Sequence, residues 1–140
     1  MRNRSSIVNC VASSKGRDLR LLSASTPLGA IGRLALVDQR LDGISADPRV
    51  HAIEGDFGDD RVLSEALQPD VDLIFHLASV PGGLAEREFD LGMRVNLHSM
   101  IALLEAVRRQ ERRPRFVFAS TIGVYGVPLP ALVDENTPAE

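Results

Sequence analysis

The sequence predicts an α/β fold in which short strands alternate with helices and together form one parallel sheet. Predicted strands lie at residues 33–37, 50–54, 71–75 and 116–119, and helical segments separate the last three. Strands joined through helices pair in parallel by right-handed crossovers. Polar residues follow three of these strands, at Asp38, His76 and Ser120. Because the carboxyl ends of parallel strands share one edge of the sheet, we expect a ligand crevice there.

The helical segments lie at residues 59–67 and 89–112. Asp59 and Asp60 suit the positive N-terminal end of the first. In the second, apolar residues recur at three- and four-residue spacing, which predicts a single buried stripe made of Leu97, Ile101, Leu104 and Val107. Pro114 is expected to close this helix.

Composition bounds the class of protein. The 140 residues allow one domain, and a net charge of −3 argues against a nucleic-acid partner. The single cysteine, Cys10, excludes an internal disulfide, and His51 and His98 have no partners at metal-ligand spacing, so no metal site is expected. No apolar run approaches the roughly 18 residues of a membrane span, and no signal peptide is evident. We therefore expect a cytoplasmic protein that does not enter a membrane.

An ordered set of motifs carries a family resemblance. Leu-Val-Asp ends at Asp38, Gly-Asp-Phe spans 55–57, His-Leu-Ala-Ser spans 76–79, Val-Asn-Leu spans 95–97, and Ala-Ser-Thr-Ile-Gly-Val-Tyr-Gly spans 119–126. The set resembles the extended short-chain dehydrogenase/reductases, the NAD-dependent epimerase/dehydratase family. Segments 88–97 and 127–130 most resemble its D-erythronate dehydrogenase-like branch. The resemblance covers residues 28–140 and implies a single NAD(P)-binding domain, a Rossmann-like doubly wound parallel sheet that is incomplete within residues 1–140.

The resemblance also implies an adenosine site for NAD. A carboxylate at Asp38 can accept both ribose hydroxyls and would repel a 2′-phosphate, which favours NAD over NADP; the alternative is a solvent-facing turn residue. Asp56 is expected to face the adenine amino group with Phe57 lining the ring pocket, or else to serve the following helix N-terminus. The segment Leu77-Ala78-Ser79 is expected to let the cofactor lie against the backbone. His76 is more typical of a packing residue.

The resemblance further implies a catalytic role for Thr121, as the hydroxyl that bonds the substrate oxygen during hydride transfer. Ser120 would line the nicotinamide pocket, and Tyr125 belongs to a structural Val-Tyr-Gly element. The alternative is that the two hydroxyls cap the strand end. Asn96 is expected to be buried and to link its helix to a strand through hydrogen bonds.

Residues 1–25 fit the family less well. Ile7 suits the start of a first strand, and Gly16 suits the last glycine of a Gly-x-x-Gly-x-x-Gly turn, but the first two glycines are absent. That turn requires backbone angles and a close phosphate approach that a β-carbon obstructs. Either the chain lacks normal pyrophosphate binding, or residues 1–15 arise from a wrong start site or a reading-frame error. We favour the second hypothesis.

The family's general acid/base is the Tyr of a Tyr-x-x-x-Lys motif, which no part of residues 1–140 contains. At the family's spacing it would follow Glu140. We therefore expect a truncated NAD-dependent oxidoreductase whose parent acts on a sugar acid or nucleotide sugar, with a homo-oligomer possible. The alternatives are a non-catalytic nucleotide-binding module and a gene fragment without function.

Overall fold

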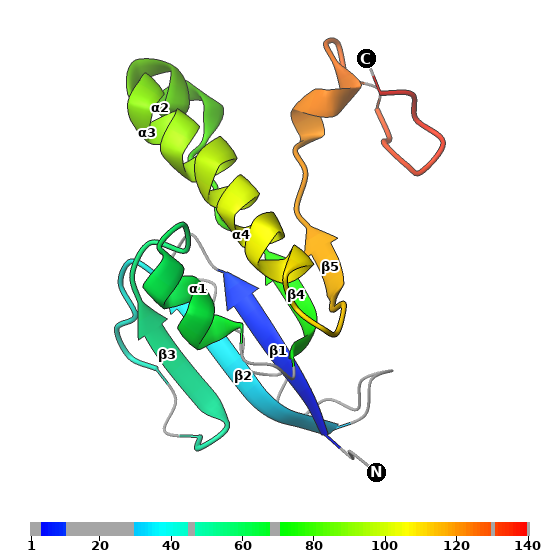
Figure 1. Cartoon of the computed structure of the whole chain (residues 1–140). Coiled ribbons are helices and arrows are strands. Elements are labelled where there is room, and N and C mark those ends of the chain that lie inside the picture. Colours follow the sequence, from blue (N-terminus) through cyan, green and yellow to red (C-terminus); the bar gives the residue numbers. More distant parts are fainter. Residues whose placement is uncertain (1–3, 11–29, 45–46, 68–70, 130, 140) are drawn as a thin grey trace.

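A computed structural model describes residues 4–10, 30–44, 47–67, 71–129 and 131–139. Five strands form one sheet in the order β3-β2-β1-β4-β5, and every neighbouring pair is parallel. The strands are β1 Arg4–Cys10, β2 Ala30–Asp38, β3 Val50–Glu54, β4 Val71–His76 and β5 Arg115–Phe118. The order reverses at the central β1, from which the chain first builds one half of the sheet and then the other (Figure 1). The predicted parallel α/β sheet is thereby confirmed.

The first strand occupies the central position that a Rossmann-like sheet requires. Residues 4–10 pair with β2 on one side and β4 on the other. The proposed strand start at Ile7 is therefore inside β1. The turn that would follow, including Gly16, lies outside the described residues, as do residues 11–15 of the start-site hypothesis.

The helical segments are α1 Asp60–Ala66, α2 Gly82–Arg87, α3 Phe89–Gly92, the π-helical turn η2 Met93–His98, α4 Ser99–Arg108 and the 3₁₀ turn η3 Ile122–Tyr125. The single helix expected over 89–112 was wrong in two respects: a π-turn interrupts it, and it ends at Arg108, well before Pro114. Within the described residues, no helix combines the length and hydropathy of a membrane-spanning segment.

The larger core lies between the sheet and the helices α1 and α4. Val62 and Leu63 of α1, Ile74 of β4 and Leu103 of α4 are all buried in this cluster, and Figure 1 shows both helices over the same face of the sheet. A smaller cluster covers the opposite side of β2 and β4. Strand β2 is thus buried on both faces, as its nearly continuous apolar sequence indicates.

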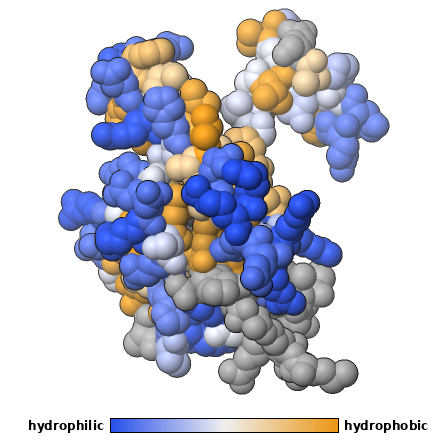
Figure 2. Space-filling model, viewed as in Figure 1, coloured by the Kyte–Doolittle hydropathy of each residue, from blue (hydrophilic) through white to orange (hydrophobic). Residues whose placement is uncertain are grey.

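The expected buried stripe on the long helix was mostly wrong. Leu97, Ile101 and Leu104 are 43%, 50% and 47% exposed, and of the predicted stripe only Val107 packs against the core. The buried side of α4 is instead formed by Ser99, Ala102, Leu103 and Ala106, of which Ser99 and Leu103 are fully enclosed. Small side chains at three of these positions let the helix axis come close to its neighbours. Figure 2 shows apolar surface alongside this helical region.

Candidate functional site

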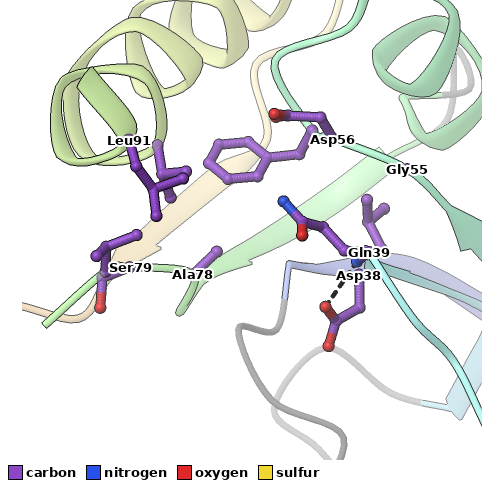
Figure 3. A pocket seen from close by; sticks show the side chains of 11 residues that line it. Asp38, Gln39, Gly55, Asp56, Ala78, Ser79 and Leu91 are labelled. Carbon is purple, nitrogen blue, oxygen red and sulfur yellow. Dashed lines mark hydrogen bonds between the residues drawn. The ribbon is translucent and has the colours of Figure 1, made fainter. Parts of the chain in front are cut away.

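A cavity of about 180 Å³ lies at the carboxyl ends of β2, β3 and β4 (Figure 3). Its volume is smaller than the roughly 300 Å³ at which sites for drug-sized ligands begin, so it suits one end of a larger ligand. Strand ends, the loop after β3 and the helical segment 89–98 supply its walls. The lining residues are Val37, Asp38, Gln39, Gly55, Asp56, Phe57, Ala78, Ser79, Val80, Leu91 and Val95.

Asp38 stands at the end of β2. Its Oδ1 accepts a hydrogen bond from the Gln39 backbone N–H at 2.6 Å, and its carbonyl accepts one from the Gly55 N–H at 3.0 Å. No hydrogen bond to its Oδ2 is found among the described residues. Gly55 has a φ of +153°, and a β-carbon there would lie 2.6 Å from Cγ2 of Val62. Glycine therefore lets β3 turn sharply towards α1 and keeps the loop close to Asp38.

Asp56 and Phe57 follow this glycine. Oδ1 of Asp56 accepts from the Gly58 N–H at 2.9 Å and lies 3.3 Å from Oγ of Ser99. Its Oδ2 lies 3.9 Å from Nε of Arg94, a loose ion pair at the surface. The N-cap of α1 is Asp59, so the carboxylate of Asp56 caps its own loop rather than the helix.

His76 ends β4 beneath the cavity. It is 2% exposed, and its Nδ1 has no hydrogen-bond partner among the described residues. Its ring meets Phe57 edge-on at 4.7 Å between centroids and stacks with Phe118 at 5.9 Å. Burial lowers the pKa of this imidazole below its ordinary value, which favours the neutral form. This environment fits the packing role expected for His76.

The side-chain amide of Asn96 fixes the loop that follows β4. Asn96 donates from Nδ2 to the carbonyl of Val80 at 2.9 Å, and its Oδ1 accepts from the Val80 N–H at 2.8 Å. This pair of bonds imitates strand pairing and fixes the backbone next to Ala78 and Ser79, which line the cavity. Leu77 does not line it and is 42% exposed. The expected hydrogen bonds of Asn96 are present, but they join its helix to the loop after β4 and not to a strand, and Asn96 is exposed and not buried.

Ser120 and Thr121 are not among the residues that line the cavity. They follow β5 at the same edge of the sheet, where the Ala119 N–H donates to the carbonyl of His76 at 3.1 Å. Oγ1 of Thr121 accepts from the Gly123 N–H at 3.2 Å and forms the N-cap of η3. The cavity therefore gathers Asp38, Asp56, Phe57, Ala78 and Ser79, and leaves the two hydroxyls outside it.

Sequence reasoning missed part of the cavity wall. Gln39 directly follows Asp38, and Figure 3 shows its side chain reaching into the cavity. The sequence signal that could have identified Gln39 is its position directly after the carboxylate that ends β2. No sequence signal identifies Val80, Leu91 and Val95, because their position beside the cavity depends on the hydrogen bonds of Asn96 and on the path of the helical segment. In the described part of the chain, no group of three or more His, Cys, Asp or Glu side chains is arranged to hold a metal.

A 3-2-1-4-5 parallel sheet with a cavity beside its central reversal defines a Rossmann-like α/β protein. Comparison with known proteins agrees with that class. A nucleoside-diphosphate-sugar epimerase from Agrobacterium tumefaciens is 31% identical and superimposes with a TM-score of 0.73 over 91% of this chain and 40% of its own. A dTDP-glucose 4,6-dehydratase from Streptomyces venezuelae, solved with NAD bound, shares the fold at 22% identity, with a TM-score of 0.78 over 97% of this chain and 45% of its own.

The sequence comparison is more specific. Residues 11–140 match the NAD dependent epimerase/dehydratase family. The chain belongs to that family. A D-erythronate dehydrogenase from Cupriavidus necator is 46% identical over 112 residues, which are 77% of this chain and 33% of that protein. The chain thus spans about a third of the length of the curated relatives that it matches.

Proposed function

We propose that this chain binds the adenosine end of NAD and forms the nucleotide-binding part of an epimerase/dehydratase-type oxidoreductase. The observation that carries the proposal is the cavity at the sheet edge, which places Asp38 and Asp56 around one small space. Its remaining walls are largely apolar, as a site for a nucleobase and its sugar requires. Family membership supports NAD as the cofactor class.

Each lining group has a chemical role in this proposal. Asp38 accepts the ribose hydroxyls, and its negative charge disfavours a 2′-phosphate, so NAD is preferred over NADP. Asp56 accepts from the adenine amino group, and Phe57 lines the ring pocket. Ala78 and Ser79 let the ligand approach the backbone after β4. NAD, when bound, supplies the hydride acceptor.

The parent reaction is a hydride transfer between NAD and a hydroxyl-bearing carbon of a sugar acid or nucleotide sugar. The D-erythronate dehydrogenase relatives favour a sugar acid, and the structural neighbours that act on nucleotide sugars favour the other class. In that reaction Thr121 bonds the substrate oxygen and Ser120 lines the nicotinamide pocket. The acid/base Tyr of Tyr-x-x-x-Lys is not within the 140 residues.

Binding of NAD by this chain should be led by adenosine. The sequence before Gly16 lacks two glycines that would let backbone N–H groups approach the pyrophosphate. Each charge-assisted contact of that kind is worth roughly 1.5–3 kcal/mol, and 1.4 kcal/mol is about tenfold in affinity. We therefore expect NAD to bind little better than adenosine.

Calorimetry with adenosine, NAD and NADP tests the proposal. Asp38→Ala should weaken adenosine and NAD by a similar factor. Asp42→Ala is the matched control, because Asp42 lies in the turn after β2, pairs only loosely with Arg40 at 3.7 Å and does not line the cavity. Absence of adenosine binding would sink the proposal. A far lower dissociation constant for NAD than for adenosine would show that residues 9–16 build a working phosphate site.

A non-catalytic nucleotide-binding module is the second candidate. The observation that favours it is Thr121, whose hydroxyl caps η3 outside the cavity. Residues 1–140 should show no dehydrogenase turnover with NAD and sugar acids, since a missing acid/base typically costs about 10²–10⁴-fold. Turnover that Thr121→Ala abolishes would favour the enzyme and would require a general acid/base other than the Tyr of Tyr-x-x-x-Lys.

A further inference from the structure

A buried serine closes the π-helical turn beside the cavity. Ser99 is 3% exposed although its helix is largely solvent-facing. Both its backbone N–H and its hydroxyl donate to the carbonyl of Arg94, the hydroxyl at 2.9 Å. The five-residue step between the two residues is the π-helical one, and such turns occur often at functional sites. The turn therefore sets where the Ser99 hydroxyl lies.

That hydroxyl faces the loop that carries Asp56. Oγ of Ser99 lies 3.3 Å from Oδ1 of Asp56, so its one proton is shared between this carboxylate and the carbonyl of Arg94. The loop and helix are in tight contact here, because a β-carbon on Gly58 would lie 2.6 Å from Oγ of Ser99. The Gly58 N–H donates to the same carboxylate oxygen at 2.9 Å. Two donors, one from the loop and one from the helix, thus hold one oxygen of Asp56.

Asp56 stands between two concave surfaces. It lines the cavity described above, and it also lines an adjoining groove with Gly58, Arg94, His98 and Ser99. Without the contact to Ser99, the carboxylate would keep only its own loop and the loose ion pair with Arg94, which is 60% exposed on the arginine side. A carboxylate between two open spaces can rotate away from the cavity unless a buried group restrains it.

We infer that Ser99 is a positioning residue, which holds the carboxylate of Asp56 in the orientation that recognises a 6-aminopurine. The inference rests on the proposed adenosine site. In this orientation the carboxylate accepts from the 6-amino group of adenine. A 6-oxo group, as in inosine, presents an oxygen acceptor to the same carboxylate and finds no donor there. The preference for adenosine over inosine therefore reports the orientation of Asp56.

The experiment measures both nucleosides by calorimetry with the wild-type chain, Ser99→Ala and Ser64→Ala. Ser64 is a matched control, because it is also a helical serine whose hydroxyl donates to a carbonyl, that of Arg61 at 3.1 Å, and it does not line the cavity. Ser99→Ala should reduce the adenosine-over-inosine preference about two- to tenfold, the range of one hydrogen bond. Ser64→Ala should leave the preference unchanged.

A double-mutant cycle separates positioning from a general loss of structure. If Ser99 acts through Asp56, Ser99→Ala changes no affinity further in an Asp56→Ala background. Ser99→Cys keeps the shape of the side chain and weakens the hydrogen-bond donor, so it gives the same test if the alanine variant does not fold. Its adenosine-over-inosine preference should lie between those of the wild-type chain and Ser99→Ala.

The outcomes distinguish a failure of the proposed adenosine site from a failure of the role inferred for Ser99. If the wild-type chain binds no adenosine, the proposed function fails and the role of Ser99 fails with it. If it binds adenosine but does not prefer it to inosine, or if Ser99→Ala and Ser99→Cys keep the wild-type preference, only the inference about Ser99 is overturned. An equal loss in the Asp56→Ala background would also overturn it.

Discussion

At the scale of single residues, His76 couples the core to the cavity. Its ring is buried among Phe57, Phe116 and Phe118, and Phe57 lines the cavity. Nδ1 of this buried imidazole has no hydrogen-bond partner among the described residues, and burial lowers its pKa because it penalises the charged form. Protonation of His76 at low pH would therefore disturb the packing beneath Phe57, which lines the cavity.

We expect the stability of the chain to fall with acidification through His76. Burial lowers its folded-state pKa below the ordinary 6.5, so the unfolded chain binds more protons just below that pH. The contribution is fully present above about pH 6.5 and is lost as pH falls towards the lowered folded-state pKa. Urea unfolding between pH 5 and pH 8 measures it, with His76→Phe as the reference that removes the group. An identical pH dependence in that variant would contradict the expectation.

At the scale of elements, α4 has apolar residues on two sides, and its period alone does not tell which side is buried. Leu97 of η2 and Ile101 and Leu104 of α4 form the longer apolar row, yet the helix packs through Leu103 and its small neighbours. The reason is that close approach to the sheet and to α1 favours serine and alanine at the contact, and hydropathy scores these residues poorly. The π-turn also rotates the row, which no sequence period reveals.

Two adjacent leucines of α4 give a matched pair of variants that tests which side of the helix is buried. Leu103 is 0% exposed and Leu104 is 47% exposed. Leu103→Ala should lower the free energy of unfolding by about 2–5 kcal/mol, because it leaves a cavity in the larger core. Leu104→Ala should change the free energy of unfolding by no more than about 0.5 kcal/mol, because this side chain is exposed. The two substitutions have nearly the same effect on helix propensity, so the difference between them reports burial. Urea denaturation of the two variants decides between the rows, and equal losses would contradict the burial of Leu103.

The strands and the ligand edge were predictable because their signals are local. An apolar run that stops at Asp38 reveals both a buried strand and the polar group at its end. The strand before Asp56 is shorter and mostly exposed, with Ile53 as its buried residue, and the Gly-Asp pair that follows it marks its end. The exclusion of Thr121 from the cavity was not predictable, since it depends on the path of the chain after β5 and on a cap bond to Gly123. Contacts such as Ser99 to Asp56, 43 residues apart, have no local signal either.

At the scale of the whole molecule, a large share of the apolar side chains is at the surface. The exposed set on η2, α4 and β5 comprises Leu97, Ile101, Leu104, Val117 and Phe118. Soluble monomers rarely expose contiguous apolar patches of more than a few hundred Å². The chain also spans only about a third of the length of its curated relatives. Self-association of the isolated chain is the physical consequence that we expect.

Replacing one residue of this surface by lysine should reduce that association. Ile101 is 50% exposed on α4, so Ile101→Lys removes apolar surface without opening the core, and lysine is a good helix former. Sedimentation at increasing concentration should show a smaller average mass for the variant, with an unchanged thermal midpoint at low concentration. Ser64→Lys on α1 adds the same charge at another exposed helical position but removes no apolar surface, so the average mass should stay as in the wild-type chain. That result would show that the added charge alone does not reduce association. If the wild-type chain stays monomeric throughout, or if both lysine variants lower the mass equally, the apolar row of α4 is not what drives association.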